Sequence, residues 1–276
     1  MTLTLDTPSA PPAQPLDGAA PAPPVLVRVL GPVQVDGAAR PFTRASALDL
    51  VVYLALHPRG TTTAQWATAL WPERAMAPAT VHSTSSAARR SLGADADGVD
   101  HLPHRHGRLV LGPMVGTDLD VVEVALQRGD LELQRAALRY LRGRPFDGLR
   151  REEWVIGEGH QARAEAAVAN LVGTFAGALL RAGDALGALD ALRRGIEACP
   201  YDEALWRLRL LATQRTGSQL GLDQVMAELA AVLQLPSWRG SEGPQAVRAT
   251  VHPATWATYE RLRQSQPAPG GGGGTD

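Results

Sequence analysis

Residues 118–263 show helical hydrophobic periodicity throughout, and no strand pattern interrupts it. The predicted helices span roughly residues 118–128, 131–142, 152–182, 184–198, 202–216, 219–234 and 253–264. Two similar helices begin at Gly183-Asp184 and Gly217-Ser218, 34 residues apart. This spacing is the period of tetratricopeptide repeats, in which stacked pairs of helices bury a continuous core. The repeat is imperfect, because Pro200 has no proline counterpart at position 234, so we expect stacked helical hairpins rather than a regular array.

Residues 25–113 follow a different pattern, in which short apolar runs flank three helical segments. Two runs rich in β-branched residues lie in Val25–Val35, separated by Gly31-Pro32, and predict two strands. The helical segments, with their caps and stops, span Arg44–Leu56, Thr61–Leu70 and Pro78–Leu92. A β-hairpin is predicted from Val99–Pro103 and Arg108–Leu111, which flank a turn at Gly107. This order is typical of a winged helix-turn-helix, whose third helix enters the DNA major groove.

The two patterns predict a mainly α fold with a small β component, a winged helix-turn-helix followed by a tetratricopeptide-like all-helical domain. Seven prolines in residues 1–24 and five consecutive glycines in residues 267–276 predict disordered tails, because such segments cannot order themselves around a core. The predicted parts are a proline/alanine-rich tail at 1–24, a DNA-binding domain at 25–113, a helical domain at 114–266 and a glycine-rich tail at 267–276.

Several function classes are excluded by what the chain lacks. All 27 basic residues are arginine, so a phosphate loop with its lysine, a Schiff base and a lysine general base are excluded. The motifs HExxH, GxSxG and GxGxxG are absent as well. We therefore predict no enzymatic activity and no cofactor. The one cysteine, Cys199, and the lack of a long apolar stretch indicate a cytoplasmic protein without membrane contact.

Three histidines in the predicted hairpin raise the alternative of a metal site. His101, His104 and His106 lie within six residues and carry the imidazole ligands that zinc and copper prefer. Alternation along a strand would place His101 and His104 on opposite faces, and a basic hairpin explains these residues without a metal. The interpretation without a metal is favoured, and the metal-responsive regulator stays a remote alternative.

The third helix carries short polar side chains and arginines on the face opposite its apolar stripe. Residues 25–113 hold nine arginines against six acidic residues, a charge of +3, whereas residues 114–266 carry −1. The asymmetry points to the N-terminal part as the side that faces phosphates. The candidate DNA-contacting residues are Arg44, Thr80, His82, Ser83, Ser86, Arg89, Arg90, Arg105, His106 and Arg108. The alternative interpretation is an ordinary amphipathic surface helix that contributes only to packing.

Particular strings resemble regulators of the Streptomyces antibiotic regulatory protein type, which join an OmpR-like winged helix to a bacterial transcriptional activator domain. The strings, spread over 25–263, are VRVLGPVQVDG, LWP at Leu70–Pro72, ATVHSTSSAARRSLG, HLPHRHGRLVLG, YLRGRPFDGL, Trp154, LLRAGD and CPYDEALWRL. The resemblance implies an activator of double-stranded promoter repeats that recruits RNA polymerase, with the loop from Trp71 to Pro78 at the polymerase contact. It assigns residues 114–266 to the activator domain and places the candidate residues of the third helix on the recognition helix.

Two residues depart from that family pattern and keep a second function open. Ala79 and Ala87 stand where related winged helices often carry a basic residue. The alternative is a protein-interaction scaffold that does not bind DNA and presents the helical hairpins to a partner. In either case the helical domain is expected to serve homodimerisation or partner contacts.

Overall fold

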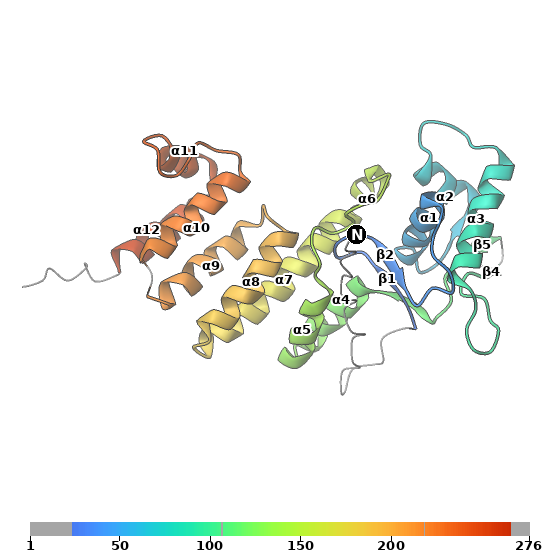
Figure 1. Cartoon of the computed structure of the whole chain (residues 1–276), viewed down its shortest axis with the longest axis horizontal. Helices are drawn as coiled ribbons and strands as arrows, with labels where there is room; N and C mark the ends of the chain where they lie inside the picture. The colour runs from blue at the N-terminus through green and yellow to red at the C-terminus, as the bar shows by residue number, and fades with distance from the viewer. Residues whose placement is uncertain (1–23, 106, 218, 266–276) are drawn as a thin grey trace, which may run out of the picture.

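The computed structural model describes residues 24–105, 107–217 and 219–265 and shows an N-terminal α/β unit followed by a row of helices (Figure 1). The tails predicted at 1–24 and 267–276 lie outside the described residues, apart from Pro24. The fold class is mainly α with a small β component, as the sequence predicts. Among the described helices, none is long and apolar enough to cross a bilayer.

A three-stranded sheet lies where the two parts of the chain meet. Strand β1 (Val25–Arg28) pairs antiparallel with β2 (Gln34–Asp36) and parallel with β6 (Val115–Thr117). The sheet order is therefore β2-β1-β6. The first two strands confirm the prediction. Strand β6 was not predicted, because three residues are too few to show a strand pattern and its pairing partner is far away in sequence.

Three helices follow the strands within the predicted ranges: α1 (Ala45–Ala55), α2 (Thr63–Leu70) and α3 (Pro78–Leu92). A capping box begins α2, because the Thr62 side chain accepts from the Gln65 N–H and the Gln65 side chain accepts from the Thr62 N–H. Trp66 of α2 is fully buried with Leu50 and Leu54 of α1 in the core of this unit. The predicted caps and apolar spacing thus account for these helices.

A second small sheet forms the wing. It contains β3 (Thr61–Thr62), β4 (His104–Arg105) and β5 (Arg108–Leu109) in the order β3-β5-β4, all antiparallel. The first arm of the hairpin was predicted at Val99–Pro103, which is wrong. The Asp95 side chain accepts from the Asp97 and Val99 N–H groups and closes a turn before this stretch, where Asp100 makes only an isolated bridge to Ala94.

The remaining chain is helical: α4 (Asp118–Arg128), α5 (Leu131–Ala137), a 3-10 turn at Leu138–Tyr140, α6 (Glu153–Gly157), α7 (His160–Arg181), α8 (Ala185–Ala198), α9 (Glu203–Arg215), α10 (Gln219–Val232), α11 (Gly243–Thr250) and α12 (Pro253–Gln264). Successive helices from α7 to α10 pack on one another. The predicted helix over 152–182 is wrong in one respect, since Gly159, with φ of 78°, separates α6 from α7. Helix α11 was not predicted.

Hydrogen bonds join Val29 and Leu30, which directly follow β1, to the helical part. The buried Asp118 carboxylate at the start of α4 accepts from the Val29 N–H at 2.8 Å and from the Leu30 N–H at 3.2 Å. In return, the Arg142 N–H donates to the Leu30 carbonyl, and the Phe146 N–H donates to the Val29 carbonyl. A network of backbone bonds, rather than a linker alone, therefore connects the sheet to the helices.

Candidate nucleic-acid interface

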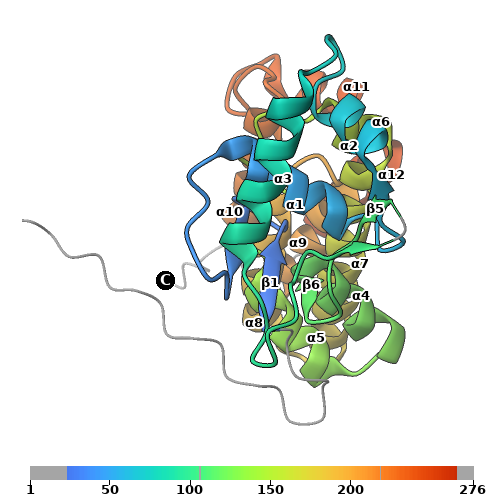
Figure 2. The same ribbon diagram turned by 90° about the vertical axis from the view of Figure 1, so that its right-hand side faces the viewer.

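Helix α3 lies on the outer face of the N-terminal unit, in front of α1, as Figure 2 shows. Its buried residues Val81, Thr84, Ala88 and Leu92 face the core. The helix contains no acidic residue, and no side chain caps its first turn. Pro78 has no N–H, and the Thr80 and Val81 N–H groups donate to the Ala77 carbonyl, so this helix end contributes little to anion binding through its backbone.

The predicted contact residues of α3 lie on its outer side or at its edges. His82 and Arg90 are exposed, whereas Thr80, Ser83 and Ser86 are half-buried. Arg44, which precedes α1, is exposed, and its guanidinium donates to the Ser83 hydroxyl at 3.0 Å. The structure thus brings together an arginine and a serine that are distant in sequence.

Arg40 is a candidate that sequence reasoning missed. It is exposed, and its N–H donates to the Ser91 carbonyl at 3.0 Å, which places it beside the last turn of α3. Among the described residues, no carboxylate pairs with Arg40, Arg44 or Arg90. The sequence signal for Arg40 was the segment RPFTR, residues 40–44. Its two arginines precede α1, and in the structure both lie next to α3.

Two predicted contact residues instead hold the wing in place. The Arg89 Nε donates to the Leu102 carbonyl at 3.0 Å. Arg108 donates to the Gly60 carbonyl through Nη2 at 2.7 Å and through Nε at 3.2 Å. Both guanidinium groups thereby satisfy backbone carbonyls, a role that leaves them fewer donors for a phosphate.

The last two predicted residues and the wing histidines are only partly described. Arg105 lies in β4 and pairs in register with Arg108, and His106 lies outside the described residues. His101 is 6% exposed, and its backbone bonds to Gly93 and Gly112. Histidine and carboxylate atoms do converge elsewhere, at His57, Glu158 and His160.

We expect Arg89→Ala to lower the free energy of unfolding by about 1–2 kcal/mol, because the buried Leu102 carbonyl loses its donor. Thermal or urea unfolding measures this loss. The dependence of DNA affinity on salt should stay close to that of the unmodified protein, because the side chain serves the wing. A drop of about one in the salt slope, with unchanged stability, would instead identify Arg89 as a phosphate contact.

A regular set of contacts fixes the winged helix against the helical part. Three side chains, spaced four residues apart along α1 and just beyond it, belong to this set. Each contacts one of three residues in the helical part that are also spaced four residues apart. The pairs are Asp49 with Arg150, Tyr53 with Trp154 and His57 with Glu158. Burial raises the pKa of Asp49 to about 6, although the charges of Arg150 and Arg151 and the Arg150 N–H oppose this shift.

The loop between α2 and α3 is exposed from Pro72 to Ala75. Between this loop and the two helices lies a groove of about 670 Å³, lined in part by Thr68, Met76 and His82. The loop and the outer side of α3 therefore form one continuous accessible surface.

Comparisons with known proteins agree with this architecture. Residues 123–221 match the model of the bacterial transcriptional activator domain. The solved structure of Mycobacterium tuberculosis EmbR in complex with a low affinity phosphopeptide is similar, with a TM-score of 0.57 and 23% identity. The match covers 88% of this chain and 66% of that chain, so the chain spans about two thirds of the EmbR length. The search of curated proteins gave no match.

Proposed function

We propose that this chain is a transcriptional regulator of the Streptomyces antibiotic regulatory protein type and that it binds promoter DNA through α3 and the wing. The match of residues 123–221 to the bacterial transcriptional activator domain supports this proposal. Residues 25–113 then serve as the DNA-binding part and residues 114–266 as the activator domain. A regulator of this kind would have no enzymatic activity. Its place of action would be the cytoplasm.

The observation that carries the proposal is the outer side of α3, which has no acidic residue and lies next to exposed arginines that pair with no carboxylate among the described residues. Short side chains such as Ser83 and Ser86 let a helix approach base edges closely, while Arg44 and Arg90 suit phosphates or a guanine edge. Arg40 extends the positive surface toward the end of α3. Ala79 and Ala87 contribute no charge, so affinity depends on the arginines that remain.

The exposed loop at Pro72–Ala75 supports a contact with RNA polymerase, as the family resemblance implies. It follows α2 directly and adjoins the groove beside Met76 and His82. A polymerase subunit bound there would lie next to promoter DNA held by α3. Activation by recruitment needs this arrangement.

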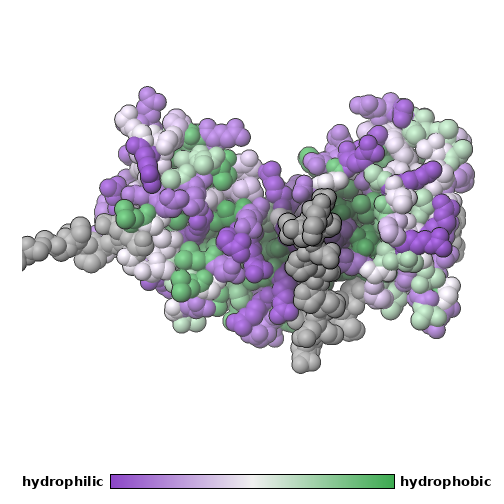
Figure 3. Space-filling model, in the orientation of Figure 1, coloured by the Kyte–Doolittle hydropathy of each residue, from purple (hydrophilic) through white to green (hydrophobic). Residues whose placement is uncertain are grey.

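A second candidate function is a protein-interaction scaffold built on the helical part. Leu186 and Leu220 are 73% and 84% exposed, and they lie 34 residues apart at the first turns of α8 and α10. Figure 3 shows hydrophobic residues, in green, on the face of this helical part. Exposed leucines at equivalent repeat positions are typical of a surface that binds a partner or a second copy of the chain.

Selection of promoter fragments by the purified protein at two salt concentrations tests the main proposal. We expect a specific repeated site, with affinity that falls steeply as salt rises, because phosphate contacts release counterions. Binding that is absent or wholly independent of sequence would favour the scaffold. In that case, a capture experiment with the full chain should lose its partner on Leu186→Asp with Leu220→Asp.

A further inference from the structure

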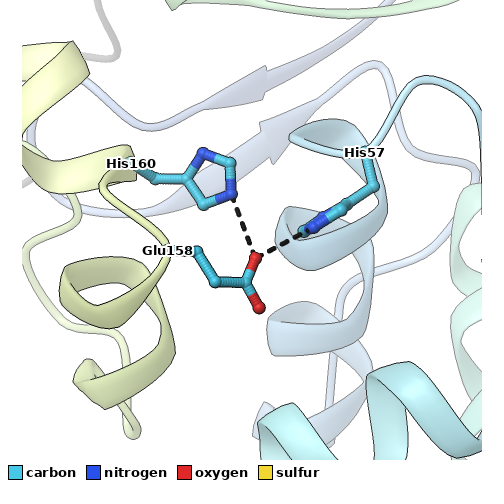
Figure 4. A group of neighbouring side chains, drawn as sticks. All are labelled: His57, Glu158 and His160. Atoms are coloured by element: carbon cyan, nitrogen blue, oxygen red, sulfur yellow. Dashed lines mark hydrogen bonds and ion pairs between the residues drawn. The ribbon is translucent and has the colours of Figure 1, made fainter.

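Three side chains from the two parts of the chain converge at the end of α1. His57 follows α1, while Glu158 and His160 flank the glycine that separates α6 from α7 (Figure 4). The His57 Nε2 lies 2.9 Å from the Glu158 Oε2, and the His160 Nε2 lies 3.3 Å from the same oxygen. The two imidazole rings are 5.3 Å apart, centroid to centroid. Ligand atoms of all three residues lie within 4.8 Å of one another.

The backbone holds the first ring nitrogen of His57. Its Nδ1 lies 2.6 Å from the Tyr53 carbonyl oxygen. A carbonyl only accepts, so Nδ1 carries a proton, and Nε2 is the ring nitrogen that faces the Glu158 carboxylate. The Nε2 atom and the carboxylate oxygen, 2.9 Å apart, can share either a proton or a metal ion. A histidine that donates Nδ1–H to a backbone carbonyl is the usual arrangement of a metal ligand.

Packing limits the position of the His160 ring. The ring is packed edge-on to Trp154, at 5.9 Å between centroids, which limits its orientation. Both imidazoles thus place Nε2 beside the same carboxylate oxygen, where a metal ion that displaces the protons would meet three ligand atoms.

From this geometry we propose that His57, Glu158 and His160 bind one divalent transition-metal ion, with Zn²⁺ the best match. Two imidazole nitrogens and one carboxylate oxygen are ligands that zinc prefers. Ligand atoms around a tetrahedral zinc ion lie about 3.3 Å apart, given bonds of about 2.0–2.1 Å. The spacing of the three side chains therefore requires only small rotations about their side-chain bonds.

We name these three residues the His₂Glu site. Its position determines how solvent reaches a bound ion and what the ion would do. His57 and Glu158 line a cavity of about 920 Å³ between the end of α1, α2 and the wing, so water can reach a fourth coordination position. One ligand comes from the DNA-binding part and two come from the activator part. A bound ion would stabilise the contact between these two parts, next to the contacts that Asp49 and Tyr53 already make. The inference is independent of DNA binding.

Titration of the full chain, freed of metal by a chelator, with zinc chloride tests the proposal by calorimetry. We expect one zinc ion per chain and a rise in Tm of about 5 °C at saturating zinc. His57→Gln with His160→Gln should weaken zinc binding by at least about 100-fold, because two of three ligands are lost. Cobalt(II) in place of zinc should show visible absorption that disappears in the same variant.

Matched variants separate this site from other histidines. His252→Gln changes an exposed histidine at the start of α12 and should leave zinc binding unchanged. Glu158→Gln, which removes only the carboxylate charge, supplies the same comparison if the double variant fails to fold. Absence of zinc binding would overturn the proposal. So would binding that persists in the double variant and disappears in His104→Gln with His106→Gln. DNA affinity is measured in parallel, so that a failure of the zinc proposal can be distinguished from a failure of the DNA-binding proposal.

Discussion

Replacing Arg44 and Arg90 together by alanine should weaken binding to the selected promoter site about 100-fold. Each guanidinium is exposed beside α3 and lacks a carboxylate partner in the described part of the chain, so each is available to DNA. A loss of about 1.4 kcal/mol per contact is a factor of about ten. The slope of log affinity against log salt should also fall by about two, because about one counterion is released per phosphate contact. Fluorescence anisotropy with a labelled DNA fragment measures both quantities.

Arg261→Ala is a control for the loss of a surface arginine far from α3. Arg261 is exposed on α12, in the part of the chain farthest in sequence from the winged helix, and its loss changes the net charge of the protein by one. Its affinity and salt slope should equal those of the unmodified protein. If the Arg44/Arg90 variant also keeps both values, α3 is not the DNA-reading element. The scaffold hypothesis would then gain weight.

Asp118→Ala should lower the free energy of unfolding by about 3–4 kcal/mol, the largest stability effect that we expect from one substitution. The carboxylate is fully buried and accepts from the N–H groups of Val29 and Leu30. Each donor left unsatisfied costs about 1–3 kcal/mol. Asp130→Ala removes an aspartate that caps α5 at the surface, and it should cost only about 1 kcal/mol. Urea unfolding of both variants measures the difference, and equal losses would contradict the role given to burial.

The same carboxyl group predicts how this loss depends on pH. Burial raises the pKa of Asp118 to about 6 from 3.8, although the two N–H donors and the charges of Arg142 and Arg28 oppose the shift. The folded protein therefore holds this proton more tightly than the unfolded chain does. The associated stability is full below about pH 4 and is lost as pH rises through about 6. The advantage of the unmodified protein over Asp118→Asn should shrink across this range, and an advantage that grows would show that the pKa is lowered instead.

The elements with strong periodicity were predictable, since each is determined by local sequence. The capping residues of α2, Thr62 and Gln65, can be recognised in the sequence, and α3 begins at Pro78 and ends before Gly93. The missed features depend on distant residues or on a single backbone angle. Strand β6 exists only because β1 pairs with it, and the break before α7 depends on the left-handed conformation of Gly159.

The sequence predicted which face of α3 is exposed, but it did not predict the role of each residue on that face. Spacing along α3 identified the outward residues, but it could not show that Arg89 donates to a wing carbonyl or that Arg44 reaches Ser83. These roles follow from chain segments that come together only on folding. One signal was available and overlooked. Asp49, Tyr53 and His57 form a polar stripe at four-residue spacing along the otherwise apolar helix α1 and just beyond its end. Such a stripe is expected of a helix that packs against a second part of the protein.

The bonds that Asp118, Arg142 and Phe146 make to Val29 and Leu30, directly after the first strand, limit where this chain can be divided. A chimera joined at residue 113 would separate a sheet from one of its strands and leave buried amides without acceptors. A junction after Gly148 would keep these groups together. Under the proposed function, new promoter specificity would therefore be more accessible through substitutions on the outer side of α3 than through exchange of whole domains. The recognition surface can diversify while the connection behind it stays constant.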